Sequence, residues 1–275
     1  MKFSVVANPK QPKMKKILTK VIGFLDDFDL EEETAKIVGL KGNPIDKLKG
    51  DMIISLGGDG TLLYILDNLN KPTFGINCGG VGFLTEIEHS DDIFSAFKRL
   101  ENKNYELQNL SRIDAFINDL HVGTALNEVV LHSSRVAKIQ GFEIEIDGSV
   151  ADSFRGDGVI IATPTGSTSY AMSVGAPILY PTMEAHVVVP MAAYRIGARP
   201  LVVPSKYEIT ARITGHPEAV MVIDGQDEIM IHKEDKINFK KSKESVELVR
   251  FKDNFFDKVR DCLLYTSPSQ RDQRG

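Results

Sequence analysis

Apolar and polar positions follow different patterns in the two halves of the chain. In the first hundred residues, short and nearly unbroken apolar runs fit strands that are buried on both faces of a parallel sheet. These runs are residues 3–7, 52–56 and 72–77. Other segments of this half have apolar side chains at helical spacing, namely residues 13–28, 62–69 and 91–100. Ser90 is the expected cap of the last helix, and residues 31–39 show no clear pattern.

The pattern changes near Tyr105. Residues 142–146 alternate strictly between apolar and polar side chains and meet an Asp147-Gly148 turn, which predicts a β-hairpin. Glycine and proline separate further predicted strands at residues 159–162, 187–189, 201–203, 207–213, 219–223 and 229–232. A short helix is expected at residues 168–174. This half of the chain therefore predicts a β-rich sandwich.

The expected fold class is an α/β N-terminal domain with a Rossmann-like parallel sheet, followed by a β-rich sandwich domain. We place the α/β nucleotide-binding domain at residues 1–104 with 247–263, and the sandwich at 105–246. Residues 251–263 predict a helix that returns to the first domain, with Phe255, Phe256 and Val259 on one side. Residues 264–275 have neither periodicity nor apolar content to bury, so we expect a non-native or disordered tail.

Composition and charge restrict the class of partner. A net charge of −5 offers no electrostatic case for nucleic acid. Cys78 and Cys262 are too few and too far apart for a disulfide framework or a zinc site, which fits a reducing compartment. No apolar run approaches the roughly 20 residues of a membrane helix. Met1 leads directly into a strand, without the plan of a signal peptide. We therefore expect a cytoplasmic protein with no membrane partner.

The candidate chemistry begins at Gly57-Gly58-Asp59-Gly60, which follows a buried strand and precedes a helix. A strand, a glycine-rich turn and a helix start place backbone N–H groups where an anion can bind. The carboxylate of Asp59 repels phosphate, so its presence indicates a proton to accept or a metal to hold. The alternative is a tight turn in which Asp and Gly supply the backbone angles.

Three stretches of the second half carry further candidates. Asn127-Glu128 interrupts an apolar run, and a buried carboxylate there needs a partner such as a sugar hydroxyl, unless Glu128 faces solvent from an edge strand. Residues 155–170 join a strand to a Gly/Ser/Thr loop with many donors, although a helix cap with a structural Tyr170 is equally compatible. Asp224-Gly225-Gln226 lies between two apolar strands, where a plain hairpin turn is the simplest explanation.

Taken together, these stretches closely resemble the NAD kinase family, which transfers a phosphoryl group to the 2′-hydroxyl of the adenosine ribose of NAD and so forms NADP. The resemblance covers most of residues 1–260. Gly57-Gly58-Asp59-Gly60 is weak by itself, since lipid kinases and phosphofructokinases carry similar runs. Asn127-Glu128 together with residues 163–170 is far more selective, and Gly82-Phe83-Leu84 and Asp224-Gly225-Gln226 fit the same pattern. Many relatives have Ala where this chain has Ser169.

The resemblance implies a role for each candidate. Asp59 is the implied general base, and the amides of Gly57, Gly58 and Gly60 face phosphates, joined by Mg²⁺ that bridges the donor's oxygens; no protein metal ligand is assigned. Asn127 and Glu128 hold ribose and adenine-side groups, and Asp157 contacts the nicotinamide end. Thr168, Ser169, Tyr170 and Ser173 line the substrate pocket, and Phe83 forms an apolar wall for a base. Asp224 belongs to an acidic cluster near the phosphates. Arg155 either contacts an anion or forms a salt bridge with Asp152 or Asp157.

The substrates implied are NAD and either ATP or polyphosphate, and the family implies a homodimer or homotetramer. Two alternatives remain from the residues. One is a lipid kinase of the diacylglycerol or sphingosine type, against which the Asn127-Glu128 pair and the lack of an apolar surface helix count. The other is a nucleotide-binding regulator without catalysis, against which the retained Asp59 counts, because a binding site alone gains little from that charge.

Overall fold

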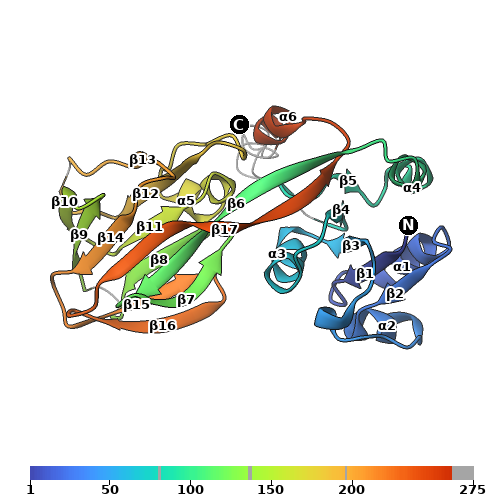
Figure 1. The fold of residues 1–275 in the computed structure, drawn as a ribbon, viewed down its shortest axis with the longest axis horizontal. Helices are drawn as coiled ribbons and strands as arrows, with labels where there is room; N and C mark the ends of the chain where they lie inside the picture. Colours follow the sequence, from blue (N-terminus) through green and yellow to red (C-terminus); the bar gives the residue numbers. More distant parts are fainter. Residues whose placement is uncertain (80–81, 136–137, 196, 262–275) are drawn as a thin grey trace, which may run out of the picture. The chain divides into compact units, whose positions relative to one another are not determined.

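The computed structural model describes residues 1–79, 82–135, 138–195 and 197–261. The tail expected at residues 264–275 lies outside this part of the chain. The chain divides into two compact units: unit 1 is Met1–Asn109 with the segment from Val246 onward, and unit 2 is Leu110–Ser245. The α/β architecture with a β sandwich is confirmed, and Figure 1 traces the elements of each unit.

Unit 1 contains a parallel sheet. Its strands are β1 (Phe3–Ala7), β2 (Phe28–Leu30), β3 (Met52–Gly57), β4 (Thr73–Asn77), β5 (Ile87–Glu88) and the end of β17 (Ile237–Arg250). Among the described residues these strands pair in parallel, with β1 between β2 and β3, and β4 on the other side of β3. Every residue of β1, β3 and β4 is buried, as expected for a parallel sheet with both faces covered.

Helices cover both faces of this sheet. The helices are α1 (Met14–Ile22), α2 (Glu32–Val38), η1 (Ile45–Lys47), α3 (Asp59–Asn68), α4 (Ile93–Glu101) and α6 (Phe255–Val259). Val5 and Ile54 share a core with side chains of α1, α2 and α4, whereas Val6 and Ile53 pack with Ile65 of α3. Alternate residues of one strand therefore enter two different cores, which explains its continuous apolar run.

Several predicted boundaries in unit 1 are wrong. Helix α1 ends at Ile22 instead of continuing to residue 28, because Gly23 caps it and Phe28 begins β2. Helix α4 is capped by Asp92 rather than by Ser90, since the carboxylate of Asp92 accepts from the amide of Ser95 at 3.2 Å. Helix α2, which showed no clear pattern, is capped by the carboxylate of Glu31.

Unit 2 is a β sandwich. One sheet has the order β10-β9-β14-β17, with β6 beside β17 and β7 beside β6. The other has the order β13-β12-β11-β8-β15-β16 and is antiparallel throughout. The strands are β6 (Glu106–Ile117), β7 (Leu120–Ala125), β8 (Glu128–Ser133), β9 (Gln140–Ile146), β10 (Ser149–Gly156), β11 (Gly158–Ala162), β12 (Ala185–Met191), β13 (Leu201–Pro204), β14 (Ile209–Ile213), β15 (Glu218–Ile223) and β16 (Asp227–His232).

Two cores support the sandwich. The larger lies between the sheets and includes Ile144 of β9 and Ile161 of β11. The smaller lies on the outer face of the second sheet, where Ala171 and Leu179 cover Ile160. The segment after β11 was expected to form one helix at residues 168–174, but it forms two, η2 (Thr165–Thr168) and α5 (Tyr170–Ser173). Thus the Gly/Ser/Thr loop lies directly over the end of β11.

The predicted hairpin is confirmed, and the closing helix is partly confirmed. Asp147 and Gly148 both have positive φ, at 50° and 78°, as a two-residue turn between β9 and β10 requires. Helix α6 belongs to unit 1, where Lys258 donates to the carbonyl of Phe83 at 3.0 Å. Its expected apolar side is only half buried, because Phe255 is buried whereas Phe256 is 70% exposed.

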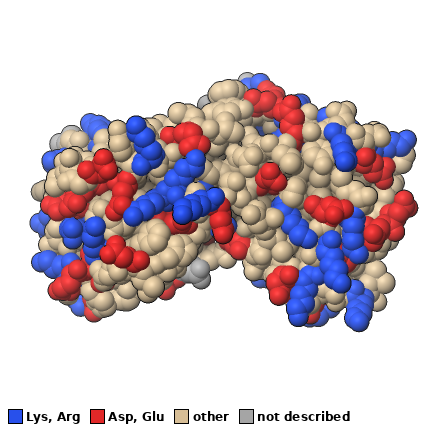
Figure 2. All heavy atoms as spheres, in the orientation of Figure 1, with Lys and Arg blue, Asp and Glu red and all other residues tan. Residues whose placement is uncertain are grey.

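Surface charge is mixed. In the face drawn in Figure 2, lysine and arginine side chains are interspersed with aspartate and glutamate over the described residues. The lysines of α1 (Lys15, Lys16 and Lys20) are exposed while Leu18 is buried, so they form the solvated face of that helix. In the described part of the chain, no helix has the length and apolar character needed to span a membrane.

Candidate active site

The glycine-rich turn of unit 1 lies at the carboxyl end of β3, at the start of α3. Helix α3 begins at Asp59, three residues before the expected start at Leu62, and Gly58 is its N-cap residue. The first amides of a helix have no partner within the helix, and the helix dipole places partial positive charge there. Asp59 therefore lies in the first turn of α3 rather than in a loop before it, beside backbone groups suited to an anion.

The three glycines of this turn differ in whether the surrounding protein leaves room for a side chain. A Cβ on Gly57 would lie 2.2 Å from Oγ1 of Thr61, so the fold itself requires glycine at this position. A Cβ on Gly58 would approach only the carbonyl oxygen of Gly79, at 4.0 Å, and a Cβ on Gly60 would meet nothing within 4 Å. Neither has a positive φ. Among the described neighbours nothing demands glycine at 58 or 60, so both positions leave open space beside the start of α3.

Asp59 has a fixed side chain. Its Oδ2 accepts from the amide of Phe83 at 2.8 Å, and its Oδ1 accepts from the amide of Leu84 at 3.0 Å. A Cβ on Gly82 would lie 3.1 Å from Oδ1, so the loop packs directly against the carboxylate. Each oxygen keeps a second lone pair. The carboxylate is thus held in one orientation at the start of α3 and can still accept a proton.

A pocket of about 460 Å³ opens beside this turn, within unit 1. The ends of β1 and β2, the glycine turn and one side of α3 line it through Val6, Ala7, Asn8, Pro9, Gln11, Glu31, Glu33, Gly58, Gly60, Thr61 and Tyr64. The described lining contains two carboxylates and no lysine or arginine. Burial, followed by the charges of Glu31 and Glu33, raises the pKa of Tyr64. The glycine turn at the start of α3 and the two carboxylates at the start of α2 thus line the pocket from different elements.

In unit 2, Asn127 and Glu128 form a rigid corner. The turn between β15 and β16 places Asp224 at a φ of 45°, and its carboxylate accepts from the amides of Leu126, Asn127 and Glu128 at 2.6, 2.9 and 2.9 Å. The amide of Asp224 donates back to the carbonyl of Glu128 at 3.0 Å. The hairpin turn therefore also accepts hydrogen bonds, through the Asp224 carboxylate, from the amides of residues 126–128, which are distant in the sequence.

The Gly/Ser/Thr segment holds the same corner from the other side. Oγ1 of Thr163 donates to the carbonyl of Leu126 at 2.5 Å, and its amide donates to the carbonyl of Asn127 at 2.8 Å. A Cβ on Gly166 would lie 2.0 Å from that same carbonyl oxygen of Asn127. Only glycine allows this approach, so Gly166 is required by the packing against Asn127.

Glu128 is buried, and its two carboxylate oxygens differ in their hydrogen bonding. Oε1 accepts from Oγ of Ser169 at 3.1 Å, whereas Oε2 has no hydrogen-bond partner among the described residues. Burial first, and then the charge of Asp224, raises the pKa of Glu128 to about 7, although hydrogen bonds from Ser169 and Tyr170 oppose the shift. The solvent-facing alternative for Glu128 is wrong, because only 6% of this residue is exposed.

The other candidates of unit 2 fall into two groups. Ser169 joins the Glu128 corner, and Tyr170 begins α5 with 46% of its surface exposed. The hydroxyls of Thr168 and Ser173 instead donate to backbone carbonyls one turn earlier, of Thr165 and Tyr170. Of these, Ser169 is the one whose hydroxyl is directed at the buried carboxylate.

Arg155 and Asp157 lie away from this corner. Ala162 is opposite Glu128 in the β8–β11 ladder, whereas Gly158 is opposite His132, about 13 Å along the strands at roughly 3.3 Å per residue, and Asp157 is one residue farther from the corner. Both side chains are exposed. Asp152, one of the two carboxylates expected to pair with Arg155, forms an ion pair with Arg195 at 2.5 Å.

Sequence reasoning missed several groups that act here. Glu31 lines the unit 1 pocket, and the one available signal was a carboxylate immediately after an apolar strand end. Thr163 donates to the carbonyl of Leu126 and Asp224 accepts from its amide, and neither role left a local signal, because these partners are 37 and 98 residues away.

No cluster of three or more metal-binding side chains occurs among the residues described. Mg²⁺ at phosphoryl-transfer sites is usually held by one or two carboxylates together with the substrate's phosphates, so such a cluster is not needed. Asp59, beside the glycine amides, is the carboxylate that fits this arrangement.

Comparison with known protein families gives matches in both units. The model of the ATP-NAD kinase N-terminal domain matches residues 3–105, and that of the ATP-NAD kinase C-terminal domain matches residues 126–251. A NAD kinase of Methanosarcina acetivorans is 41% identical over 239 residues, which are 84% of this chain and 86% of that protein. A NAD kinase of Thermoplasma volcanium is 38% identical over 235 residues, covering 85% and 86%.

Solved structures agree with these matches. An NAD kinase from Archaeoglobus fulgidus in complex with ATP is 32% identical, with a TM-score of 0.75 over 94% of this chain and 99% of that one. Yeast NADH kinase complexed with NADH has a TM-score of 0.85 over 97% and 88%, and at 19% identity it supports the fold alone. Nothing in these comparisons supports the lipid-kinase alternative.

Proposed function

The chain belongs to the NAD kinase family and phosphorylates NAD, and we propose that Asp59 is the general base of this reaction. The 2′-hydroxyl of the adenosine ribose attacks the terminal phosphorus of the donor. Its O–H bond breaks as the new O–P bond forms, the proton moves to the Asp59 carboxylate, and the bond to the donor's leaving phosphate breaks. The observation that carries this role is the carboxylate fixed by Phe83 and Leu84 at the start of α3.

For NAD, we propose that Glu128 and Asn127 are the main polar contacts. Oε2 of Glu128 is buried without a partner, and a buried carboxylate oxygen is costly unless it accepts a hydrogen bond. A ribose hydroxyl or an adenine amino group supplies that donor. Tyr170 offers an exposed ring for stacking, and Phe83 offers an apolar wall to a base. We keep Arg155 and Asp157 as contacts for the far, nicotinamide end of the dinucleotide.

For Asp224, Thr168 and Ser173, the geometry supports indirect roles. The carboxylate of Asp224 already accepts three amides of the Asn127 corner, so we propose that it orients Asn127 and Glu128 instead of contacting phosphates. The hydroxyls of Thr168 and Ser173 stabilise the helical turns on which Ser169 and Tyr170 are presented.

For the phosphoryl donor, we propose ATP or a similar nucleoside triphosphate in preference to polyphosphate. The unit 1 pocket places helix N-terminal amides at one side, where the terminal phosphates fit. Its other side carries Glu31 and Glu33, which repel a polyanion but accept hydrogen bonds from ribose hydroxyls. A polyphosphate chain long enough to fill this pocket would therefore place phosphates against carboxylates.

A divalent cation, Mg²⁺ or another, would be supplied with the donor in this proposal, and its chemistry would be to neutralise negative charge on the phosphates. The Asp59 carboxylate and the amides of Gly58 and Gly60 are the protein groups beside it. Their own contribution is to hold the phosphates and to accept the proton.

We further propose that the protein is a homodimer or homotetramer that associates through unit 2. The edge strands β10 and β13 expose Val150 at 62% and Val202 at 49%, and exposed apolar edge strands are candidates for pairing with a second chain. Light scattering on the purified protein measures the subunit number, and a monomer at micromolar concentration would contradict this proposal.

The experiment that tests the proposed function is an assay of NADP formation from NAD, with ATP and with polyphosphate as donors. We expect turnover with ATP and weak or no turnover with polyphosphate. Asp59→Asn should lower kcat at least about 100-fold and leave the Kd for NAD within a few-fold, as removal of a base predicts. Asp67→Asn, an exposed position on the same helix, is the matched control. Undiminished kcat in Asp59→Asn would remove this carboxylate from the mechanism.

A further inference from the structure

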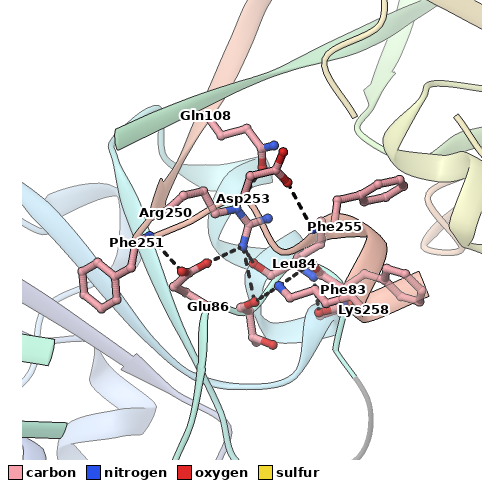
Figure 3. A network of polar contacts seen from close by, with 11 residues as sticks. Phe83, Leu84, Glu86, Gln108, Arg250, Phe251, Asp253, Phe255 and Lys258 are labelled. Carbon is pink, nitrogen blue, oxygen red and sulfur yellow. Dashed lines mark hydrogen bonds and ion pairs between the residues drawn. The ribbon is translucent and has the colours of Figure 1, made fainter. Parts of the chain in front are cut away.

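The loop from Gly82 to Glu86 is held through its amides and through its carbonyls within unit 1, and Figure 3 shows its contacts with Arg250 and Lys258. Its amides at Phe83 and Leu84 donate to the Asp59 carboxylate. Its carbonyls accept from two cations of the C-terminal segment. Nη1 of Arg250 donates to Leu84 at 2.9 Å and to Thr85 at 3.3 Å. Nζ of Lys258 donates to Phe83 at 3.0 Å and also to Thr85.

Arg250 is a buried cation with a complete set of partners. Its side chain is 11% exposed, and that of Glu86, to which it is paired at 3.3 Å, is 2% exposed. Its Nε donates to Gln108 at 2.9 Å, and the other oxygen of Glu86 accepts from the amide of Phe251 at 2.8 Å. A buried ion pair is weak evidence for stability, because desolvation offsets the attraction between the charges. The desolvation cost of burying the Arg250–Glu86 pair therefore indicates a role other than stability.

One contact of Lys258 shares a peptide plane with a contact of Asp59, whereas the carbonyls that Arg250 holds, of Leu84 and Thr85, belong to the next two planes of the loop. A peptide group whose carbonyl is fixed has its N–H direction restricted as well, because the peptide unit is planar. The carbonyl of Phe83 belongs to the same peptide plane as the amide of Leu84, which donates to Oδ1 of Asp59. The ammonium of Lys258 thus sets the direction of an N–H that orients the carboxylate.

We propose that Arg250 and Lys258 are positioning residues for the phosphoryl transfer, acting on Asp59 through the Phe83–Leu84 amides. This inference rests on the proposed role of Asp59 as general base. The two cations do not contact substrate in this scheme. They hold the loop so that its amides keep the carboxylate in the one orientation that faces the ribose hydroxyl, and a misplacement of about 1 Å costs about 100-fold in rate.

The first test uses Lys258→Met, because Lys258 is half-buried and methionine retains the length of its apolar stem. We expect kcat to fall about 10- to 100-fold while KM for NAD and for ATP stays within about twofold. Lys252→Met, at an exposed lysine of the same segment, is the control and should keep full kcat. Wild-type kcat in Lys258→Met, or a change confined to KM, would overturn the inference.

The second test asks whether the cations act through Asp59. If they do, Lys258→Met in the Asp59→Asn background lowers kcat no further, because the carboxylate that it orients is gone. A merely structural role predicts the same fold-loss in both backgrounds and would contradict the proposal.

Arg250→Lys and Arg250→Met extend the series. The lysine variant retains a charge but not the planar fork, so we expect partial kcat, above that of the methionine variant. Arg250→Met leaves Glu86 buried without its partner, so its folding is checked first by thermal unfolding, and Lys258→Met decides the question if it does not fold. Loss of activity in Asp59→Asn with full activity in Lys258→Met would refute the positioning role and leave the proposed function intact.

Discussion

At the residue scale, the two oxygens of Glu128 have different environments. One accepts from Ser169, and the other is buried without a partner among the described residues. The pKa of this carboxyl is raised to about 7 by burial and by the nearby Asp224. A group that titrates near neutral pH and contacts the substrate makes binding pH-dependent.

We therefore predict that kcat/KM for NAD rises as pH increases through about 7, because only ionised Glu128 offers a full negative charge to the substrate's donor. Glu128→Gln should raise KM for NAD about 10- to 100-fold, the value of a lost charge-assisted hydrogen bond, and remove this step in the profile. Steady-state kinetics between pH 5.5 and 8.5, with Glu228→Gln as an exposed control, measures both effects. An unchanged KM for NAD would count against Glu128 as a contact.

Gly60 gives a second prediction at this scale. A methyl group there meets nothing within 4 Å of the protein, and alanine is the better helix former by about 1 kcal/mol. Gly60→Ala should therefore keep or slightly raise the unfolding free energy, while its methyl group weakens donor binding at the pocket wall. We expect a higher KM for ATP with an unchanged KM for NAD. Equal KM for ATP in variant and wild type would show that the donor does not approach Gly60.

At the element scale, the β15–β16 turn has two functions. It reverses the chain with Asp224 and Gly225 at positive φ, and it supplies the acceptor for three consecutive amides at the start of β8. The same corner is held by the segment after β11 through Thr163. Two turns from different parts of unit 2 thus position Asn127 and Glu128.

We predict that Asp224→Asn destabilises the protein by about 1–3 kcal/mol and raises KM for NAD, because an amide cannot accept from all three backbone donors. Asp119→Asn is the matched control, since Asp119 is also a turn aspartate with positive φ, at 66°. Urea unfolding measures the stability change. A destabilisation without any change in KM for NAD would limit the role of Asp224 to folding.

At the scale of the whole molecule, the groups assigned to the donor belong to unit 1, whereas Asn127 and Glu128, the main polar contacts assigned to NAD, belong to unit 2. This explains why we expect Gly60→Ala and Glu128→Gln to affect different substrates.

Stability is also a property of the whole chain, and a buried histidine in unit 2 links the unfolding free energy to pH. His186 is fully buried, and neither ring nitrogen has a partner among the described residues.

Burial, followed by the charge of Lys241, lowers the pKa of His186 from 6.5 to about 4, and Glu184 opposes the shift. Because the unfolded chain takes up this proton first, the stability contribution is complete above about pH 6.5 and is lost as pH falls toward 4. The full loss is about 3 kcal/mol at 1.36 kcal/mol per pKa unit. His186→Leu should remove this loss, so its unfolding free energy falls less than that of wild type between pH 7 and 5. If the unfolding free energies of wild type and His186→Leu fell by the same amount between pH 7 and 5, His186 would be excluded as the cause of the loss of stability.

Comparison with the sequence-based predictions shows where local patterns suffice. Continuous apolar runs predicted β1, β3 and β4, because strands buried on both faces leave no alternation. The boundaries of α1 and α4 were wrong, since the end of a helix depends on which cap competes best in the folded chain. The choice of Asp59, Asn127 and Glu128 as candidates came from polar residues placed in apolar surroundings and from the family resemblance.

The sequence by itself determined the two fold classes, the order of the strands along the chain and the residue types available for chemistry, because periodicity and turn residues are local properties. Only the tertiary structure decided what each polar atom bonds. Asp59 accepts from amides 24 and 25 residues away, and Asp224 accepts from amides 96 to 98 residues away. Such partners are brought together by sheet packing and strand order, and no local spacing in the chain encodes the directions in which their hydrogen bonds point.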